Sequence, residues 1–318
     1  MSNSYFLWPE SRFHRGVIKS LKLHDITEIE VMLKKMYGQG FPVVVSSARV
    51  GIVLTLTIQE LTRPDKVGVF PYASYCVLEA ISRVATPFSN ERLLDSKLDL
   101  IYHQWGYVQK QNLHENGKLI EDAVDSFCLP GVKLFPLNGL YEIWSFPKLI
   151  GSLGGGVVWC RDEQTADQLR VLRDTRQKST QIRWMLRLFS QYFSNFSKYW
   201  YGTESLGGPL PRWAAGDILY GLECLEKIAT KRKERIGLLE SKLPEWLHPS
   251  EKRLPCVIPV EVSDEEVRLL NGIGLKIGLR TFQRIDNNES SLVKLFPIPV
   301  HQDIPCELLD KALKVLSK

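Results

Sequence analysis

A lysine and an aspartate carry the side chains in this sequence that are best suited to chemistry. Asp122 ends an apolar stretch within residues 118–123, and Lys148 lies in the segment 144–148, shortly before three consecutive glycines at 154–156. A lysine amine can hold an aldehyde as a Schiff base, and a carboxylate can keep a pyridine nitrogen protonated so that the ring accepts electrons. Chemistry that depends on pyridoxal phosphate needs both groups.

A serine-rich turn offers a site for a phosphate group. Ser47, Ala48 and Arg49 join a predicted strand to the start of a predicted helix. The backbone N–H groups and the dipole at a helix N-terminus favour an anion. Serine is also a common N-cap, so the same residues could simply begin the helix. The turn alone leaves both interpretations open.

Ser145 stands three residues before Lys148, a spacing that brings a hydroxyl and an amine within reach of one ligand. The hydroxyl would bind the phosphate while the amine binds the aldehyde. Serine acyl enzymes use the same spacing, but they also need Ser-Asp-Asn and Lys-Thr-Gly elements, which this sequence lacks. A surface lysine at position 148 and a helix cap at Asp122 remain the simpler alternatives.

The composition is that of an ordinary globular protein with room for two domains. The chain has 318 residues, of which 44% are apolar and 24% are charged, and its net charge is +5. So small a charge gives no indication of nucleic-acid binding, and the basic cluster at 231–233 is interpreted as a solvated helix face.

The cysteines and histidines indicate neither a disulfide framework nor a metal site. The six cysteines lie far apart without a Cys-x-x-Cys pair, and the six histidines lack metal-binding spacing. The longest apolar run, 41–56, is interrupted by polar residues and is too short to cross a membrane. No secretory signal opens the sequence. We therefore expect a cytoplasmic protein without a membrane partner.

Helical and strand patterns alternate along the first half of the chain, which predicts an α/β fold with a mainly parallel sheet. The helices are expected over 20–37, from 46 to about 61 and over 75–84. The strands are expected over 41–45, 67–70, 99–102, 118–121, 143–146 and 157–160.

The second half begins with an aromatic-rich segment at 182–201, which suits a packed helix, a dimer contact or a flap over a site. A break at 207–211 precedes one long predicted helix over 213–243. We expect this helix to bridge two domains, 1–225 and 226–318. Strands are predicted over 256–262 and 293–297, and a last helix over 306–316.

In this order, the motifs resemble the fold-type-I pyridoxal enzymes, and most of all the DegT-type family of sugar aminotransferases. Residues 45–49 occupy the slot of that family's phosphate turn, and 120–123 match its hydrophobic-Glu-Asp-Ala signature. The segment 145–156 is similar to its Ser-Phe-x-Lys element followed by glycines. Similarity also extends over 69–72, 77–81, 85–87, 214–235 and 296–301, and it is strongest over 43–160.

The resemblance implies a large three-layer domain with a mainly parallel sheet, followed by a smaller C-terminal α/β domain. It implies that Lys148 forms the internal aldimine and shuttles protons, and that Asp122 pairs with the pyridinium nitrogen. The other residues expected at the cofactor are Ser47, Ala48, Arg49 and Ser145 around the phosphate, Tyr72 or Tyr75 on the ring, and Asp125 near the ring hydroxyl.

The activity implied is that of a pyridoxal-phosphate-dependent aminotransferase of sugar biosynthesis. Its amino donor would be glutamate or glutamine, its acceptor a keto sugar linked to a nucleotide, and its active site would lie between the subunits of a homodimer. The alternative is a degenerate member that keeps the fold but only binds or regulates. That alternative is motivated by Ser74, where the family has its ring-stacking aromatic, and by Asp125, where it has Gln or His.

Overall fold

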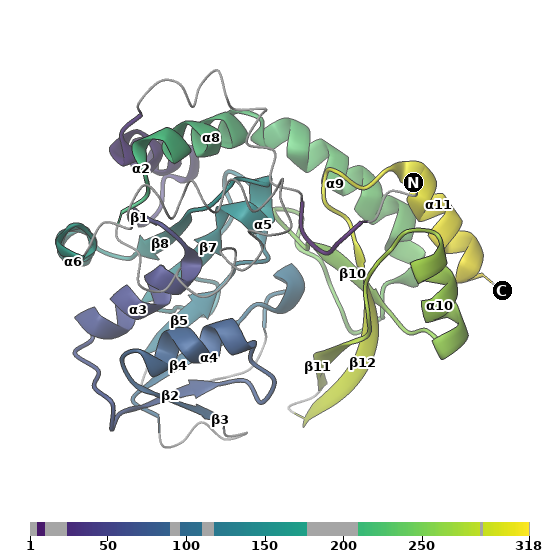
Figure 1. Cartoon of the computed structure of the whole chain (residues 1–318), viewed down its shortest axis with the longest axis horizontal. Coiled ribbons are helices and arrows are strands. Elements are labelled where there is room, and N and C mark those ends of the chain that lie inside the picture. Colours follow the sequence, from purple (N-terminus) through teal and green to yellow (C-terminus); the bar gives the residue numbers. More distant parts are fainter. Residues whose placement is uncertain are drawn as a thin grey trace, which may run out of the picture.

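A computed structural model of the chain describes residues 5–9, 24–89, 96–109, 118–176, 209–286 and 289–317. The aromatic-rich segment 182–201 lies outside these residues. Figure 1 shows two parts, a sheet flanked by helices and a smaller C-terminal sheet with helices of its own.

Seven strands of the described chain form one mixed, mostly parallel sheet, which confirms the predicted α/β class. Its order is β1-β8-β7-β5-β4-β2-β3. Only β8 runs antiparallel to its neighbours, β1 and β7. The strands are β1 (Phe41–Val45), β2 (Lys66–Val69), β3 (Thr86–Ser89), β4 (Leu98–Tyr102), β5 (Leu119–Asp122), β7 (Tyr141–Ser145) and β8 (Gly156–Cys160).

Both faces of this sheet are covered because successive strand residues point to opposite faces and both sets are apolar. Trp144 and Trp159 pack on one face against α2 (Ile26–Tyr37), α5 (Phe146–Ile150) and α8 (Arg212–Glu223). Ile143 and Val158 pack on the other face against α3 (Ala48–Ile58), α4 (Tyr75–Ser82) and α6 (Glu163–Thr175). The result is a three-layer arrangement (Figure 1).

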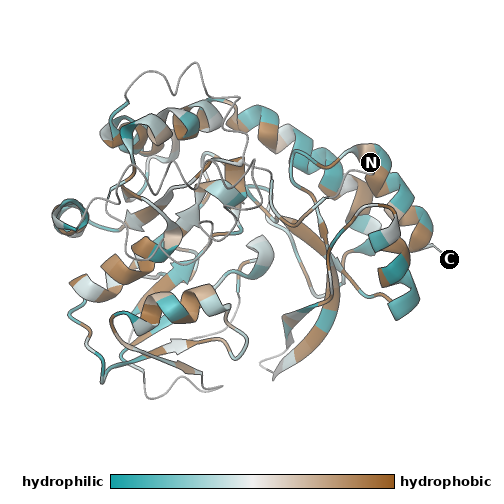
Figure 2. Ribbon diagram, viewed as in Figure 1, coloured by the Kyte–Doolittle hydropathy of each residue, from teal (hydrophilic) through white to brown (hydrophobic). Residues whose placement is uncertain are grey.

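The C-terminal part is built on a three-stranded antiparallel sheet in the order β10-β12-β11. Its core packs against three helices, and Figure 2 shows hydrophilic residues along the outer sides of these helices, in contrast to the largely hydrophobic α3. The elements are α9 (Leu225–Leu239), β10 (Val257–Val260), α10 (Asp264–Gly272), β11 (Arg280–Asp286), β12 (Glu289–Pro299) and α11 (Cys306–Val315).

The single long helix predicted over 213–243 is wrong. The chain instead forms α8 and α9, which meet at Cys224 (φ −86°, ψ 6°), and a 3-10 helix at Glu240–Lys242 follows. α8 packs tightly on α5, since a Cβ added at Gly221 would lie 2.5 Å from Cδ1 of Ile150. Cys224 separates the two helices: α8 packs in the first core, whereas α9 begins in that core with Leu225 and Ile228 and ends in the second core at Leu239. Local sequence carries no signal for this interruption.

Other boundaries follow local capping chemistry. The first helix begins at Ile26, later than predicted, because Asp25 caps it in a capping box with Glu28; residues 20–23 lie outside the described part. Four further elements, α6, α10, β3 and β11, were not predicted from the sequence. Of these, α10 does carry a readable signal, the capping box of Ser263 and Glu266.

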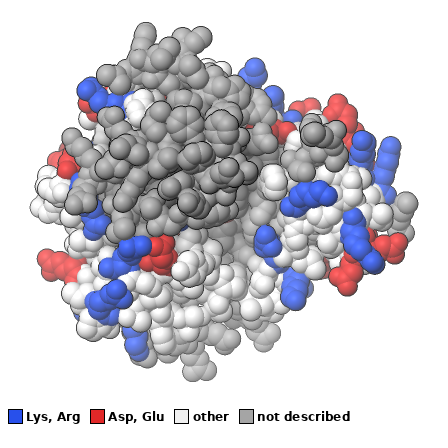
Figure 3. All heavy atoms as spheres, in the orientation of Figure 1, with Lys and Arg blue, Asp and Glu red and all other residues white. Residues whose placement is uncertain are grey.

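The surface and the cysteines show no unusual chemistry. On the face shown in Figure 3, the basic side chains of the described residues are interspersed with acidic ones. All six cysteines are free. Among the described helices, none combines the length and the apolar character that crossing a membrane requires.

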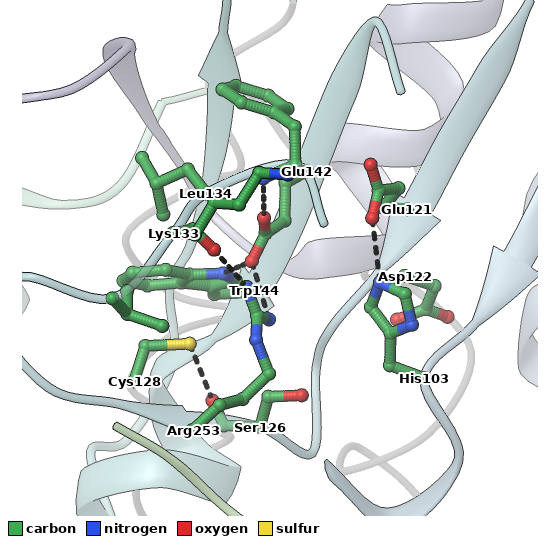
Figure 4. Close-up of polar contacts among 12 residues, drawn as sticks. His103, Glu121, Asp122, Ser126, Cys128, Lys133, Leu134, Glu142, Trp144 and Arg253 are labelled. Atoms are coloured by element: carbon green, nitrogen blue, oxygen red, sulfur yellow. Dashed lines mark hydrogen bonds and ion pairs between the residues drawn. The ribbon is translucent and has the colours of Figure 1, made fainter. Parts of the chain in front are cut away.

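A buried ion pair ties the central sheet to the strand that leads into the C-terminal part (Figure 4). Glu142 on β7 is fully buried and lies 2.8 Å from Nη1 of Arg253 on β9 (Arg253–Leu254). It also accepts hydrogen bonds from the Trp144 indole and the Phe135 N–H, both at 2.6 Å. Burial raises the pKa of Glu142, but the charge and hydrogen bond of Arg253 outweigh burial and lower it.

We expect Arg253→Met to lower the free energy of unfolding by about 3–5 kcal/mol at neutral pH, because Glu142 would stay buried without its counter-charge. Urea unfolding followed by circular dichroism measures the change. Arg268→Met, at an exposed position on α10, is the control and should change stability by less than about 0.5 kcal/mol. A loss below about 1 kcal/mol for Arg253→Met would contradict the assigned role.

Candidate active site

The candidate residues gather at one edge of the central sheet. The strands β1, β2, β4, β5 and β7 run in the same direction, so the residues that follow them meet at their carboxyl ends, where open α/β sheets bind ligands. β8 runs the other way and brings the glycines that precede it to the same edge, where the Gly155 N–H donates to the Ser46 carbonyl oxygen at 2.8 Å.

Lys148 and the two aspartates come from adjacent parallel strands. Asp122 is the last residue of β5 and pairs in register with Ile143 of β7, and Lys148 lies in the short helix that follows β7. The Lys148 amine lies 3.1 Å from Oδ1 of the buried Asp125. The sequence prediction placed Asp122, Asp125 and Lys148 near one another, and the structure brings them together.

These charges shift one another. The pKa of Asp122 is raised to about 7, and burial is the main cause. The charge of Lys148 acts against this rise, and Asp125 adds to it. Burial disfavours the charge on Lys148, but Asp125 and then Asp122 outweigh burial, so the pKa of Lys148 lies above its ordinary value. Near neutral pH the Lys148 ammonium group therefore lies close to a partly protonated carboxyl group, that of Asp122.

The turn after β5 holds both aspartates through local hydrogen bonds. Oδ1 of Asp122 accepts from the Val124 N–H at 3.2 Å, and the Ala123 N–H donates to the Ile143 carbonyl oxygen at 2.9 Å. The hydroxyl of Tyr102, at the end of β4, donates to Asp125. Burial raises the pKa of Tyr102, so this hydroxyl keeps its proton.

Glu121, the neighbour of Asp122, points to the other side of β5 (Figure 4) and belongs to a separate network. It is fully buried, lies 2.8 Å from Nε2 of His103, and accepts the N–H groups of Leu137 and Gly139. This network fixes the loop that leads into β7, and no contact between it and Lys148 is seen among the described residues.

The serine-rich turn begins α3, as predicted. Ser47 is the N-cap, and its Oγ accepts from the Val50 N–H at 3.3 Å. Gly156 lies so close that an added Cβ would be 2.7 Å from the Ala48 nitrogen. The hydroxyl of Ser46 is buried and has no hydrogen-bond partner among the described residues. Arg49, in the first turn of α3, is half-buried.

The remaining predicted residues have different surroundings. Ser145 ends β7 and is 9% exposed. Tyr72 follows β2, stacks on Phe70 with ring centroids 5.9 Å apart, and its hydroxyl lies 3.2 Å from Oε1 of Gln283. Tyr75 is 83% exposed at the start of α4, so its side chain has little contact with the rest of the protein.

Trp8, which was not predicted from the sequence, adjoins the Lys148 amine, and a second tryptophan packs behind it. The amine lies 4.3 Å from the ring centroid of Trp8, and Trp8 stacks on Trp105 at 5.6 Å. Trp105 has a left-handed backbone (φ 58°), which is uncommon for a bulky residue and recurs at functional sites. In the sequence, the one local feature that indicates a tight turn at Trp105 is the glycine directly after it, Gly106.

Arg232 supports the helix that carries Lys148. Its Nη2 donates to the carbonyl oxygens of Leu149 at 2.8 Å and Lys148 at 3.3 Å, and its guanidinium lies over the Phe127 ring at 4.5 Å. Arg232 is fully buried, so the solvated face predicted for 231–233 is wrong for this residue, although Lys231 and Lys233 are exposed. Packing of α9 on α5 explains the difference.

Among the described residues, no group of three or more histidine, cysteine, aspartate or glutamate side chains could hold a metal ion.

Solved structures with the same fold cover nearly the whole chain. AtS13 from Actinomadura melliaura is 17% identical, with a TM-score of 0.68 and coverage of 99% of this chain and 98% of its own. A DegT DnrJ EryC1 StrS aminotransferase from Brucella abortus is 16% identical, with a TM-score of 0.66 and coverage of 96% and 94%. The aminotransferase TlmJ from Streptoalloteichus hindustanus is 16% identical, with a TM-score of 0.64 and coverage of 100% and 99%.

These structures confirm the fold-type-I architecture. At sequence identities of 16% to 17%, the similarity establishes the fold and not the activity. No curated protein sequence matches the chain significantly. A family model described as "Putative PLP-dependent aminotransferase" matches residues 29–313. This match spans both sheets and every predicted site residue, and the protein therefore belongs to this family of aminotransferases that depend on pyridoxal 5'-phosphate (PLP).

Proposed function

We propose that the protein moves an amino group from an amino-acid donor to a keto sugar linked to a nucleotide, with Lys148 as the lysine that holds PLP. One observation carries the proposal. The Lys148 amine lies beside a buried carboxylate at the ends of two adjacent parallel strands, with a second buried carboxyl group, that of Asp122, near enough to shift its pKa.

The described residues fit PLP at three points. Lys148 offers an amine and Asp122 a buried carboxyl group. The first N–H groups of α3 have no partner within the helix and suit a phosphate, and the unpartnered Ser46 hydroxyl lies in the same turn. When bound, PLP supplies an aldehyde for the lysine and a ring that accepts electrons.

Each residue then has a separate task. Lys148 would hold the cofactor through Nζ and afterwards move a proton at the substrate carbon. Asp122 would pair with the ring nitrogen, and its buried position would make that charge pair strong. Asp125 would orient the free amine between these steps, which its 3.1 Å contact with Nζ supports.

The phosphate would be held by Ser47, Ala48, Arg49 and Ser145, which lie after β1 and at the end of β7. For the ring we propose Tyr72, which lies at the end of β2. Tyr75 is the other predicted aromatic. Its 83% exposure would allow it to meet a substrate or a second subunit rather than a cofactor within its own chain.

The keto-sugar acceptor, the glutamate or glutamine donor and the homodimer are proposed from the family resemblance. A domain boundary near residue 225 is supported by the interruption between α8 and α9 at Cys224 and by the separate hydrophobic core of the C-terminal part. A cytoplasmic location is supported by six free cysteines, which a reducing compartment would preserve.

The cofactor lysine can be tested directly. Purified protein should bind PLP with a visible absorbance band, and borohydride should fix the cofactor covalently on Lys148, which peptide mass spectrometry can locate. Lys148→Ala should lose the band and the modified peptide, because no other amine of the described residues pairs with the aspartates at this edge.

Lys118→Ala is the matched control, because Lys118 is an exposed lysine that precedes β5 at its far end. It should bind PLP like the wild type. Modification of another lysine in the wild type would reassign the site. No band at saturating PLP would favour the alternative of a degenerate member that keeps the fold without the chemistry.

Asp122→Asn should separate stability from activity. Burial raises the pKa of Asp122 from its ordinary value near 4 to about 7 in the folded protein. Between these two pH values the unfolded chain loses this proton while the folded protein keeps it, so the free energy of unfolding falls as the pH rises. The cofactor-free Asn variant should therefore gain about 3 kcal/mol over wild type between pH 5 and pH 8. Amino transfer should meanwhile fall by about 10²–10³-fold. The assignment would be contradicted if the urea midpoint of the variant differed from that of the wild type by the same amount at pH 5 and at pH 8.

The substrate class needs its own test. The PLP-loaded protein should release 2-oxoglutarate or its amide from glutamate or glutamine and then aminate a nucleotide-linked keto sugar, which mass spectrometry detects as the amino sugar. Release of the keto acid without amination of any such sugar would support aminotransferase activity but would exclude the proposed acceptor.

A further inference from the structure

Residues 5–9 are attached to the C-terminal part of the protein. The Tyr5 N–H donates to the Gly274 carbonyl oxygen at 2.9 Å, and the Lys276 N–H donates to the Tyr5 carbonyl oxygen at 3.2 Å. These two bonds form a short parallel bridge to Leu275, which lies in the core beside β10 and β12. The segment is therefore fixed at one end by backbone hydrogen bonds.

His301 fixes the next residue. This histidine is 2% exposed; its Nε2 lies 3.0 Å from the Phe6 carbonyl oxygen, and its Nδ1 lies 3.3 Å from the Asp303 nitrogen. Because Nδ1 accepts the Asp303 N–H, the proton must be on Nε2, which donates to Phe6. The segment thus leaves the C-terminal part in a defined direction.

This direction brings Trp8 over the Lys148 amine. The two rings of Trp8 and Trp105 are nearly parallel, with an interplanar angle of 20°, and the Trp8 side chain packs on the cluster that contains Tyr107 and Phe282. The Lys148 amine lies 4.3 Å from the Trp8 ring centroid and 3.1 Å from Asp125. The amine therefore contacts an aromatic face and a carboxylate at the same time.

We propose that Trp8 is a positioning residue for the Lys148 amine, held in place by the C-terminal part through residues 5–9. Its role in amino transfer rests on the proposed function. A lysine side chain has a long flexible stem, and one ion pair fixes its direction poorly. The indole adds a cation–π contact and covers the amine, and exclusion of water strengthens the pair with Asp125.

The reactivity of Lys148 in the cofactor-free full chain tests this proposal without any substrate. Trace labelling with acetic anhydride over a range of pH, followed by peptide mass spectrometry, gives the limiting rate for each lysine. Trp8→Ala should raise the limiting rate of Lys148 by roughly threefold to tenfold, because the amine loses its cover and its cation–π partner. Trp8→Phe, which keeps an aromatic face, should restore most of the protection.

Two controls make the result specific. Phe6→Ala removes a 55% exposed ring from the same segment and keeps the backbone acceptor for His301, so it should leave Lys148 unchanged. The exposed Lys118 serves as the internal reference in every sample. If Trp8→Ala does not fold by circular dichroism, Trp8→Leu keeps an apolar side chain on Trp105 and should still expose the amine.

The proposal is overturned if Lys148 reacts at the wild-type rate in a folded Trp8→Ala or Trp8→Leu variant. It is also overturned if Lys148 is as reactive in Trp8→Phe as in Trp8→Ala, since an aromatic face at position 8 would then not protect the amine. Failure of the protein to bind PLP would refute the proposed function and leave the labelling result intact, so the two failures are distinguishable.

Discussion

The parallel pairing of β5 with β7 is the constraint on which the site depends. It sets Asp122 beside Ile143 in register, and the helix that carries Lys148 begins three residues after Ile143. Each strand is buried on both faces, so a slip of one residue would exchange the two apolar faces and separate the amine from the carboxyl groups. The cores on the two faces of the sheet therefore hold the chemical groups in place.

The buried carboxyl groups on β5 and β7 differ in how their charges are compensated. Glu142 has the guanidinium of Arg253, and Glu121 has His103 and two backbone N–H groups. Asp122 accepts one backbone N–H, and its pKa rises because burial outweighs its neighbours. Residues with strongly shifted pKa values mark functional sites. Glu142 and Glu121 have partners within the protein, whereas Asp122 is the group for which we propose a ligand cation as the partner.

The C-terminal part contributes to the site from several directions. Arg232 holds the carbonyl oxygens at Lys148, Gln283 contacts Tyr72, and residues 5–9 bring Trp8 to the amine. These contacts cross between segments that are distant in sequence. A change in the packing of α9 or of the C-terminal sheet would therefore alter the position of Lys148, although most of the candidate groups follow strands of the central sheet.

The sequence by itself determined six of the seven strands of the central sheet, because apolar runs bounded by turns leave few alternatives, but it did not predict β3 at the edge of the sheet. Since polar residues after parallel strands must meet at one edge, it also brought Asp122 and Lys148 together, and the family resemblance indicated the same pair. It missed α10, although Ser263 begins a readable capping box. Only the tertiary structure decided the break at Cys224, the burial of Arg232 and the place of Trp8. These depend on contacts between segments far apart in the chain, which local periodicity and spacing do not encode.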